Sequence, residues 1–175
     1  ILILDSFNSL IINLSGYKKL NGSQLTKGDI TIKDIVSSVI NKEINVLKQI
    51  GVKVDVKKNQ IRIRGTKIIK KINLKTAPYP GFPTDLQAQI MVLLCKSNKN
   101  SLIKEEIFEN RFMHIPELNR MGAKISINKN KALIEGRINF KGAELTATDL
   151  RASVSLILAA LTAEGKSKIS RIYHL

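Results

Sequence analysis

The stretch Leu47–Gly65, "LKQIGVKVDVKKNQIRIRG", has a second version of itself further along the chain, "LNRMGAKISINKNKALIEG", at Leu118–Gly136. A leucine and two glycines recur 71 positions later, in the pairs Leu47/Leu118, Gly51/Gly122 and Gly65/Gly136. In each copy a helical segment stops at a glycine, where a left-handed backbone costs little. Apolar residues then alternate on both sides of a polar turn, which is the pattern of a β-hairpin. Each copy therefore predicts a helix that ends at glycine and is followed by two strands.

A second pair of similar segments lies nearby. "PTDLQAQIMVLL" (83–94) and "ATDLRASVSLIL" (147–158) place Asp85 and Asp149 64 positions apart. Each predicts a helix after a threonine, then a polar turn and a strand. One unit is thus strand, helix, strand, helix and hairpin, over about 65–70 residues, and units of this length predict a modular α/β fold packed around a shared axis. We expect one partial domain over residues 1–175, with units at about 1–70, 71–137 and 138–175, the first and last incomplete.

The first unit departs from this pattern. In the third unit Gly142 and Gly165 are 23 residues apart and enclose the first helix, whereas the matching pair in the first unit, Gly22 and Gly28, is 6 apart. Either about 17 residues, one helix with its entry turn, are missing there, or "SQLT" is a tight turn and the two segments do not correspond.

Composition narrows the class of protein. The net charge is +15, but 22 of the 29 basic residues are scattered lysines, and base-stacking aromatics are few, with three Tyr, five Phe and no Trp. We therefore do not expect nucleic-acid binding, although a basic nucleic-acid-binding protein stays as a competing hypothesis. The single Cys95 excludes an internal disulfide. No apolar run has the length of a membrane span and no leader is visible, so we expect a cytoplasmic protein without membrane attachment.

Residues 76–89, "TAPYPGFPTDLQAQ", allow two interpretations of Asp85. Thr84 as the N-cap and Gln87 three residues later would form a capping box, with Asp85 an ordinary first-turn acid that complements the helix dipole. Alternatively, a loop stiffened by three prolines holds the Asp85 carboxylate in place for a substrate hydroxyl. Composition does not decide between them. In the second copy Arg151 replaces the glutamine and is free to point elsewhere.

These motifs, together with "IFENRFMHIPELNRMGA" (107–123), "ATDLRASVSLILAALTAEG" (147–165) and the closing "RIYHL", resemble the UDP-N-acetylglucosamine 1-carboxyvinyltransferase family of enolpyruvyl transferases. The resemblance is continuous from about residue 76 to 175 and weaker before it. It implies an inside-out α/β barrel of repeated units, incomplete here. It also implies transfer of the enolpyruvyl group of phosphoenolpyruvate to the 3′-hydroxyl of UDP-N-acetylglucosamine, an early step of peptidoglycan synthesis, with no cofactor and no metal ion.

The resemblance also implies roles for particular residues. Asp85 would contact the sugar nucleotide and accept the proton of its 3′-hydroxyl, or only ligate that hydroxyl. Ile107 would line the sugar-nucleotide site, mainly through its backbone. Arg151 would favour anionic oxygens, with Asp149 beside it. For Arg111, a structural ion pair and a ligand contact are equally open.

Other features receive structural interpretations. We expect His114 to be a capping or core histidine and Cys95 to be a small apolar core residue. Family members are more than twice as long and carry further active-site residues in another domain. The chain is therefore expected to be a fragment, inactive alone, which either works with a separate N-terminal half or survives as a remnant that only binds the UDP-sugar.

Overall fold

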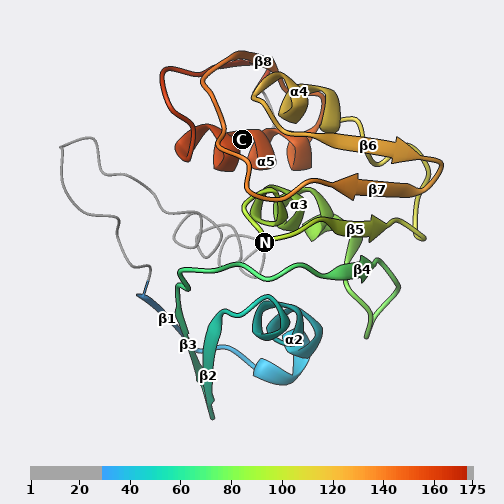
Figure 1. Ribbon diagram of the computed structural model, residues 1–175. Coiled ribbons are helices and arrows are strands. Elements are labelled where there is room, and N and C mark those ends of the chain that lie inside the picture. The colour runs from blue at the N-terminus through green and yellow to red at the C-terminus, as the bar shows by residue number, and fades with distance from the viewer. Residues whose placement is uncertain (1–28, 173–175) are drawn as a thin grey trace.

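The computed structural model describes residues 29–172 (Figure 1). They form three sheets, with strand orders β1-β3-β2, β4-β5-β7-β6 and β8-β9. The strands are β1 (Asp29–Lys33), β2 (Lys53–Lys57), β3 (Gln60–Arg64), β4 (Asn73–Lys75), β5 (Ser101–Lys104), β6 (Ile125–Asn128), β7 (Lys131–Ile134), β8 (Glu144–Thr146) and β9 (Lys168–Ser170). The α-helices are α2 (Asn41–Gln49), α3 (Gln87–Cys95), α4 (Ile115–Arg120) and α5 (Leu150–Leu161), with 3₁₀ turns η1 (Ser37–Ile40) and η2 (Thr84–Leu86).

The repeat predicted from the sequence is present in the backbone. Strands β4 and β5 pair in parallel across α3, as β8 and β9 do across α5, and each predicted hairpin forms, β2 with β3 and β6 with β7. Gly51 and Gly122 have positive φ angles, 96° and 90°, at the helix ends. Even a loop hydrogen bond recurs 71 residues later: Lys70 donates to Ile50 at 2.9 Å and Lys141 to Met121 at 2.8 Å. The expected deletion between Gly22 and Gly28 lies outside the described residues.

Helix α3 is the centre of the structure. All nine of its residues are buried, and it packs against α5, β5 and β7 (Figure 1). Strands such as β7, in contrast, alternate exposed and buried residues, so their outer face meets solvent. Helices inside and sheets outside are the inside-out α/β arrangement that the family resemblance implies. Cys95, at the end of α3, is fully buried, which raises the pKa of its thiol to about 12 and confirms it as a core residue.

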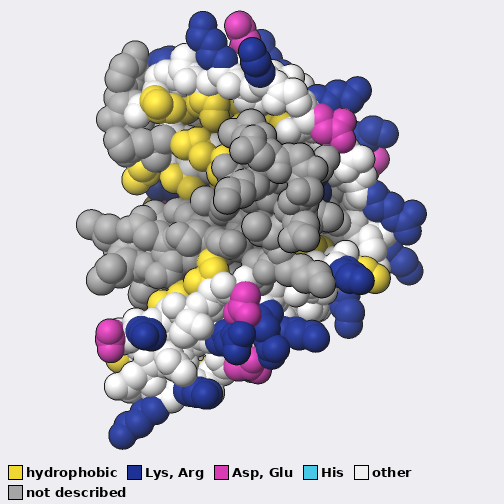
Figure 2. Space-filling view, turned by 90° about the vertical axis from the view of Figure 1, so that its left-hand side faces the viewer, with side chains coloured by type: hydrophobic (Ala, Val, Ile, Leu, Met, Phe, Trp, Pro, Cys, Tyr) yellow, Lys and Arg dark blue, Asp and Glu magenta, His cyan; other side chains and the backbone are white. Residues whose placement is uncertain are grey.

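The surface carries many basic side chains without one dominant cluster in the face that Figure 2 shows, where Lys and Arg are spread around the outline with acidic side chains between them. Some are paired, as Arg62 is with Asp29 at 2.6 Å and Arg64 with Asp55 at 2.7 Å. Within residues 29–172 no helix has the length and apolarity needed to cross a bilayer. Within the same range no group of three or more His, Cys, Asp or Glu side chains is placed to hold a metal ion.

Candidate functional site

The proline-rich loop before Asp85 is closed on itself. Ala77 N–H donates to the Phe82 carbonyl at 3.0 Å, and Gly81 N–H donates to the Pro78 carbonyl at 2.7 Å. Phe82 is fully buried and anchors the loop in the core. A Cβ on Gly81 would overlap Ala77, so only glycine fits this turn. The loop therefore delivers the chain to Asp85 along a fixed path.

The capping box predicted at Thr84 is wrong. The helix begins with the 3₁₀ turn η2, whose N-cap is Pro83 and which has no side-chain cap. The Thr84 hydroxyl instead donates to the Glu105 carboxylate at 2.9 Å, 21 residues further along. Gln87 does not reach back either, since no side-chain hydrogen bond caps this turn, and the Gln87 Nε2 is buried without a hydrogen-bond partner within the described part of the chain. Local spacing gave no sign of Glu105, whose carboxylate accepts from the Thr84 hydroxyl, whereas a helix N-terminus offers only N–H donors.

The two equivalent aspartates, Asp149 and Asp85, make different contacts. Asp149 is the N-cap of α5, and its Oδ1 accepts backbone N–H groups of Arg151 at 2.8 Å and Ala152 at 3.1 Å. Asp85 is a first-turn acid of η2, as one interpretation expects, but its side chain is 62% exposed. The hydrogen bond of Asp85 within residues 29–172 comes from a side chain, Arg151. Helix capping therefore occupies Asp149 and leaves the Asp85 carboxylate accessible.

Two arginines from different elements converge on Asp85. Its Oδ1 lies 3.3 Å from Arg151 Nη1, at the start of α5, and 3.7 Å from Arg111 Nη1, in the loop before α4. Arg151 Nε is in turn 3.7 Å from Asp149 Oδ1. Arg111 also stacks on Phe108, with its guanidinium carbon 4.4 Å from the ring centroid. We call Asp85, Arg111, Arg151 and Asp149 the charged cluster. It contains three of the predicted site residues, Asp85, Asp149 and Arg151. The fourth member is Arg111, for which the sequence left a structural ion pair and a ligand contact equally open.

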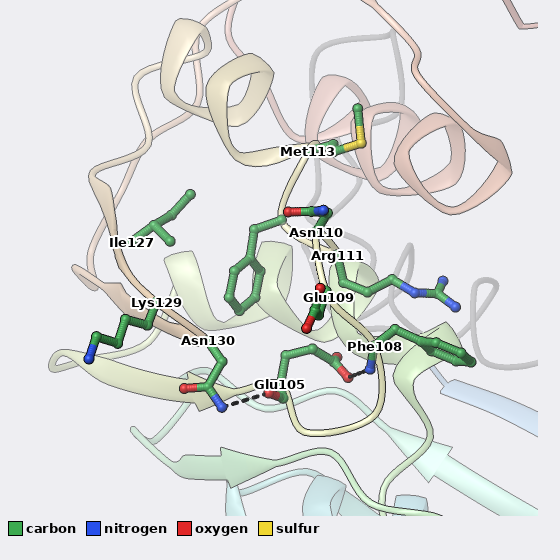
Figure 3. Close-up of a pocket in the computed structure, with 10 residues that line it drawn as sticks. Glu105, Phe108, Glu109, Asn110, Arg111, Met113, Ile127, Lys129 and Asn130 are labelled. Carbon is green, nitrogen blue, oxygen red and sulfur yellow. Dashed lines mark hydrogen bonds between the residues drawn. The ribbon is translucent and has the colours of Figure 1, made fainter.

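A cavity of about 410 Å³ lies against this cluster. Charged and polar side chains from α3, the 108–114 loop and the start of α5 line it, among them Gln87, Arg111, His114, Asp149 and Arg151. Neither Asp85 nor Ile107 is among the described lining residues, but Asp85 adjoins the cavity through its neighbour Thr84 and the two arginines, which do line it. A larger cavity of about 680 Å³ occupies the other side of the loop (Figure 3). Its walls include Phe112 and Ile127 but neither Asp149 nor Arg151, which line the smaller cavity, so the smaller cavity is the better candidate site.

His114 is a core histidine, as predicted. It is 4% exposed, and burial lowers its pKa to about 4, against a smaller opposing effect of the Asp149 charge. Its Nε2 contacts the Met91 sulfur at 3.3 Å. The imidazole is therefore neutral near pH 7 and forms part of the cavity floor. Gln87, which lines the same cavity and whose Nε2 has no hydrogen-bond partner among the described residues, was missed as a site residue, because the capping pattern accounted for it.

Ile107 reaches the cluster indirectly. Its backbone N–H donates to Glu105 Oε1 at 2.9 Å, and the same carboxylate holds Thr84, the neighbour of Asp85. Glu105 thus joins the two segments that the sequence singled out.

The charged cluster has the groups for acid–base chemistry beside an anion. An accessible carboxylate accepts a hydrogen bond, or a proton, from a hydroxyl. Guanidinium groups present donors that match phosphate or carboxylate oxygens. At 3.3 and 3.7 Å the arginines bind Asp85 loosely, so an incoming anion would compete for them.

Comparisons with known proteins agree with this geometry. The family model described as EPSP synthase (3-phosphoshikimate 1-carboxyvinyltransferase) matches residues 20–175. A UDP-N-acetylglucosamine 1-carboxyvinyltransferase of Pelagibacter ubique is 69% identical over 156 residues, covering 89% of this chain and 37% of that protein. One of Desulfosudis oleivorans is 50% identical over 151 residues, covering 86% and 36%. The chain thus spans little more than a third of the length of these relatives.

Solved structures support the fold. The enolpyruvyl transferase NikO from Streptomyces tendae superposes with a TM-score of 0.82 at 24% identity, covering 98% of this chain and 39% of that one. EPSP synthase from Acinetobacter baumannii gives 0.66 at 17% identity, covering 95% and 41%. At these identities the likeness concerns the fold alone.

Proposed function

Because the chain belongs to the EPSP synthase family of enolpyruvyl transferases, we propose that it is the sugar-nucleotide-binding part of a UDP-N-acetylglucosamine 1-carboxyvinyltransferase. The choice of acceptor rests on relatives of that name at 69% and 50% identity. The reaction would move the enolpyruvyl group of phosphoenolpyruvate to the 3′-hydroxyl of the sugar and release phosphate, a step of peptidoglycan synthesis.

The observation that carries the proposal is the contrast between the two repeated aspartates. The repeat could have used both as helix caps, and only Asp149 is used in that way. Asp85 instead follows a closed loop next to the cavity-lining Thr84 and is left 62% exposed. A fixed and accessible carboxylate suits a group that accepts the proton of the sugar hydroxyl as the new C–O bond forms.

The other members of the cluster have complementary roles. Arg151 and Arg111 would bind anionic oxygens of the substrates, and their contacts with Asp85 Oδ1, at 3.3 and 3.7 Å, orient its carboxylate. Asp149 would act beside Arg151, since its Oδ1 lies 3.7 Å from Arg151 Nε. Ile107 would meet the sugar nucleotide through backbone atoms of the 107–111 loop, which Glu105 ties to the Asp85 segment.

The chain would supply one wall of the active site. We infer that residues 1–175 are part of one domain of repeated units, and that a separate N-terminal half supplies the remaining catalytic groups. Two substrates held between domains react only when both walls are present. The enzyme would act in the cytoplasm, and this part alone would bind the UDP-sugar without turning it over.

Calorimetric titration of the chain with UDP-N-acetylglucosamine tests the proposal. We expect saturable binding by wild type, and binding weakened roughly 10- to 100-fold by Asp85→Asn, the range for losing a hydrogen bond to a charged group. Asp55→Asn is the matched control, because Asp55 is also an exposed aspartate paired with an arginine, at 2.7 Å, but lies in the outer sheet. It should leave the affinity unchanged.

The outcomes separate the alternatives. Binding without phosphate release, followed by release once the missing half is added, supports a working part of an enzyme. Binding that stays unproductive with that half present supports the remnant. A folded chain that does not bind the UDP-sugar contradicts the proposal.

A further inference from the structure

Glu105 is a buried carboxylate that joins the Asp85 segment to the 107–111 loop and has no assigned role in binding or chemistry. It follows β5 directly and is 3% exposed. Its backbone is fixed on both sides by Asn130 in the β6–β7 turn: Glu105 N–H donates to the Asn130 carbonyl at 2.8 Å, and Asn130 Nδ2 donates to the Glu105 carbonyl at 3.0 Å (Figure 3). The carboxylate therefore projects from a rigid point of the central sheet.

Four hydrogen-bond donors contact the Glu105 carboxylate. Oε1 accepts from the Thr76 hydroxyl at 2.8 Å and from the backbone N–H groups of Ile107 at 2.9 Å and Phe108 at 3.3 Å. Oε2 accepts from the Thr84 hydroxyl at 2.9 Å. A carboxylate offers about four acceptor sites over its two oxygens, and here three donors share Oε1 while one binds Oε2; none of them is a cation among residues 29–172. Burial of an acid in such a setting needs all of these donors at once.

These donors come from the two segments that meet in the charged cluster. Thr84 immediately precedes Asp85, and Phe108 carries the ring on which Arg111 stacks, 4.4 Å from the guanidinium carbon. Arg111 returns to Asp85 at 3.7 Å. The contacts thus form a closed ring, Glu105 to Thr84 and Asp85, then to Arg111, Phe108 and back. Figure 3 shows Phe108 and Arg111 on one side of the loop, away from Ile127 and Lys129.

We propose that Glu105 is a positioning residue for the sugar-nucleotide site: its carboxylate sets where Asp85 and the 107–111 loop lie relative to each other. It touches no reacting atom and acts through Thr84, Ile107 and Phe108. Because the two segments are 21 or more residues apart in sequence, local geometry alone does not fix their separation. A supporting shell of this kind determines whether a site is tight enough to bind. The proposal rests on the proposed function for its ligand.

The test uses the full chain and four variants. Glu105→Gln keeps the shape but replaces one acceptor oxygen by a donor, and Thr84→Val removes one donor should Glu105→Gln fail to fold. Thr84→Ser restores the hydroxyl. Glu106→Gln is the neighbouring control, since Glu106 pairs with Lys75 and Lys104 at the surface. We measure thermal unfolding, the Kd for UDP-N-acetylglucosamine, and amide hydrogen exchange at Ile107 and Phe108.

A positioning role predicts a Kd raised roughly tenfold by Glu105→Gln and Thr84→Val, and within about twofold of wild type for Thr84→Ser and Glu106→Gln. Amide hydrogen exchange at Ile107 and Phe108 should be about tenfold faster than in wild type for Glu105→Gln, and unchanged in the other three variants. A lowered unfolding temperature with unchanged Kd and exchange would overturn the proposal, because it would show a merely structural role.

Failure of the proposed function has a separate signature. If wild type does not bind UDP-N-acetylglucosamine, that function fails, and Glu105 is judged by measurements without ligand. Glu105→Gln should then still speed exchange at both amides and move the Asp85 carboxyl resonance, while Glu106→Gln moves neither. An unmoved Asp85 resonance would refute the positioning role.

Discussion

Alanine substitutions of the two equivalent aspartates should affect different properties. Asp149→Ala should mainly lower the free energy of unfolding, and Asp85→Ala should mainly weaken binding of UDP-N-acetylglucosamine. Asp149 caps α5 through two backbone N–H groups, at 2.8 and 3.1 Å. Its removal leaves both donors of the first turn without that partner. Loss of an N-cap costs about 1 kcal/mol, in the range of roughly 0.5–2 kcal/mol. Asp149→Ala should therefore lower the free energy of unfolding by about that amount, or the unfolding temperature by roughly 2–4 °C.

Asp85→Ala should cost much less stability. The side chain is 62% exposed, its ion pairs are 3.3 and 3.7 Å long, and solvent screens them. Exposed pairs of this kind contribute roughly 0–1 kcal/mol, so we expect a change within about 0.5 kcal/mol. The same substitution should abolish most UDP-N-acetylglucosamine binding, because it removes the hydroxyl acceptor.

Urea unfolding followed by circular dichroism measures both changes. Asp149→Asn is the matched control, since asparagine caps as well as aspartate and should restore the stability that alanine loses. If Asp85→Ala destabilises the chain as much as Asp149→Ala, Asp85 is a structural acid and the reasoning from the repeat is wrong. Equal losses for Asp149→Asn and Asp149→Ala would refute the capping account.

Three further changes test the fold. Because burial lowers the His114 pKa to about 4, the unfolded state binds the proton first, and stability should fall by up to roughly 1.4 kcal/mol per pH unit from pH 6.5 down to 4; His114→Gln should flatten that slope in urea titrations at each pH, and an unchanged slope would contradict the assignment. Gly142→Ala should destabilise by roughly 1–3 kcal/mol, because its Cβ would overlap the Lys166 carbonyl, and wild-type-like melting would contradict that contact. Cys95, with its thiol pKa raised to about 12 by burial, should resist iodoacetamide in the native chain and react in urea, as mass spectrometry would show; rapid native labelling would count against it.

The repeat made most of the fold predictable. Leu47/Leu118 and Gly51/Gly122 at a spacing of 71 predicted the helix ends and hairpins, because helix-ending glycines and alternating strands are local patterns. The inside-out arrangement was an expectation from the family resemblance. The described residues carry the same loop hydrogen bond at that spacing. Such regularities survive divergence of the side chains between units.

The site was only partly predictable. The sequence indicated Asp85, Asp149 and Arg151, and the structure brings them together, but the capping pattern misassigned Thr84 and hid Gln87. The reason is that the Thr84 hydroxyl donates to the carboxylate of Glu105, 21 residues further along, and spacing says nothing about such distant partners. The stacking of Arg111 on Phe108 is likewise set by the path of the loop rather than by any periodicity.

Parallel calorimetric titrations of the wild-type chain with UDP-N-acetylglucosamine and with 3-phosphoshikimate test the central claim most directly. Both compounds are anionic, so charge alone should not separate them. The account predicts saturable binding of the UDP-sugar that Asp85→Asn weakens, and no saturable binding of 3-phosphoshikimate. Equal affinity for the two, preference for 3-phosphoshikimate, or UDP-sugar binding that is indifferent to Asp85 would contradict it.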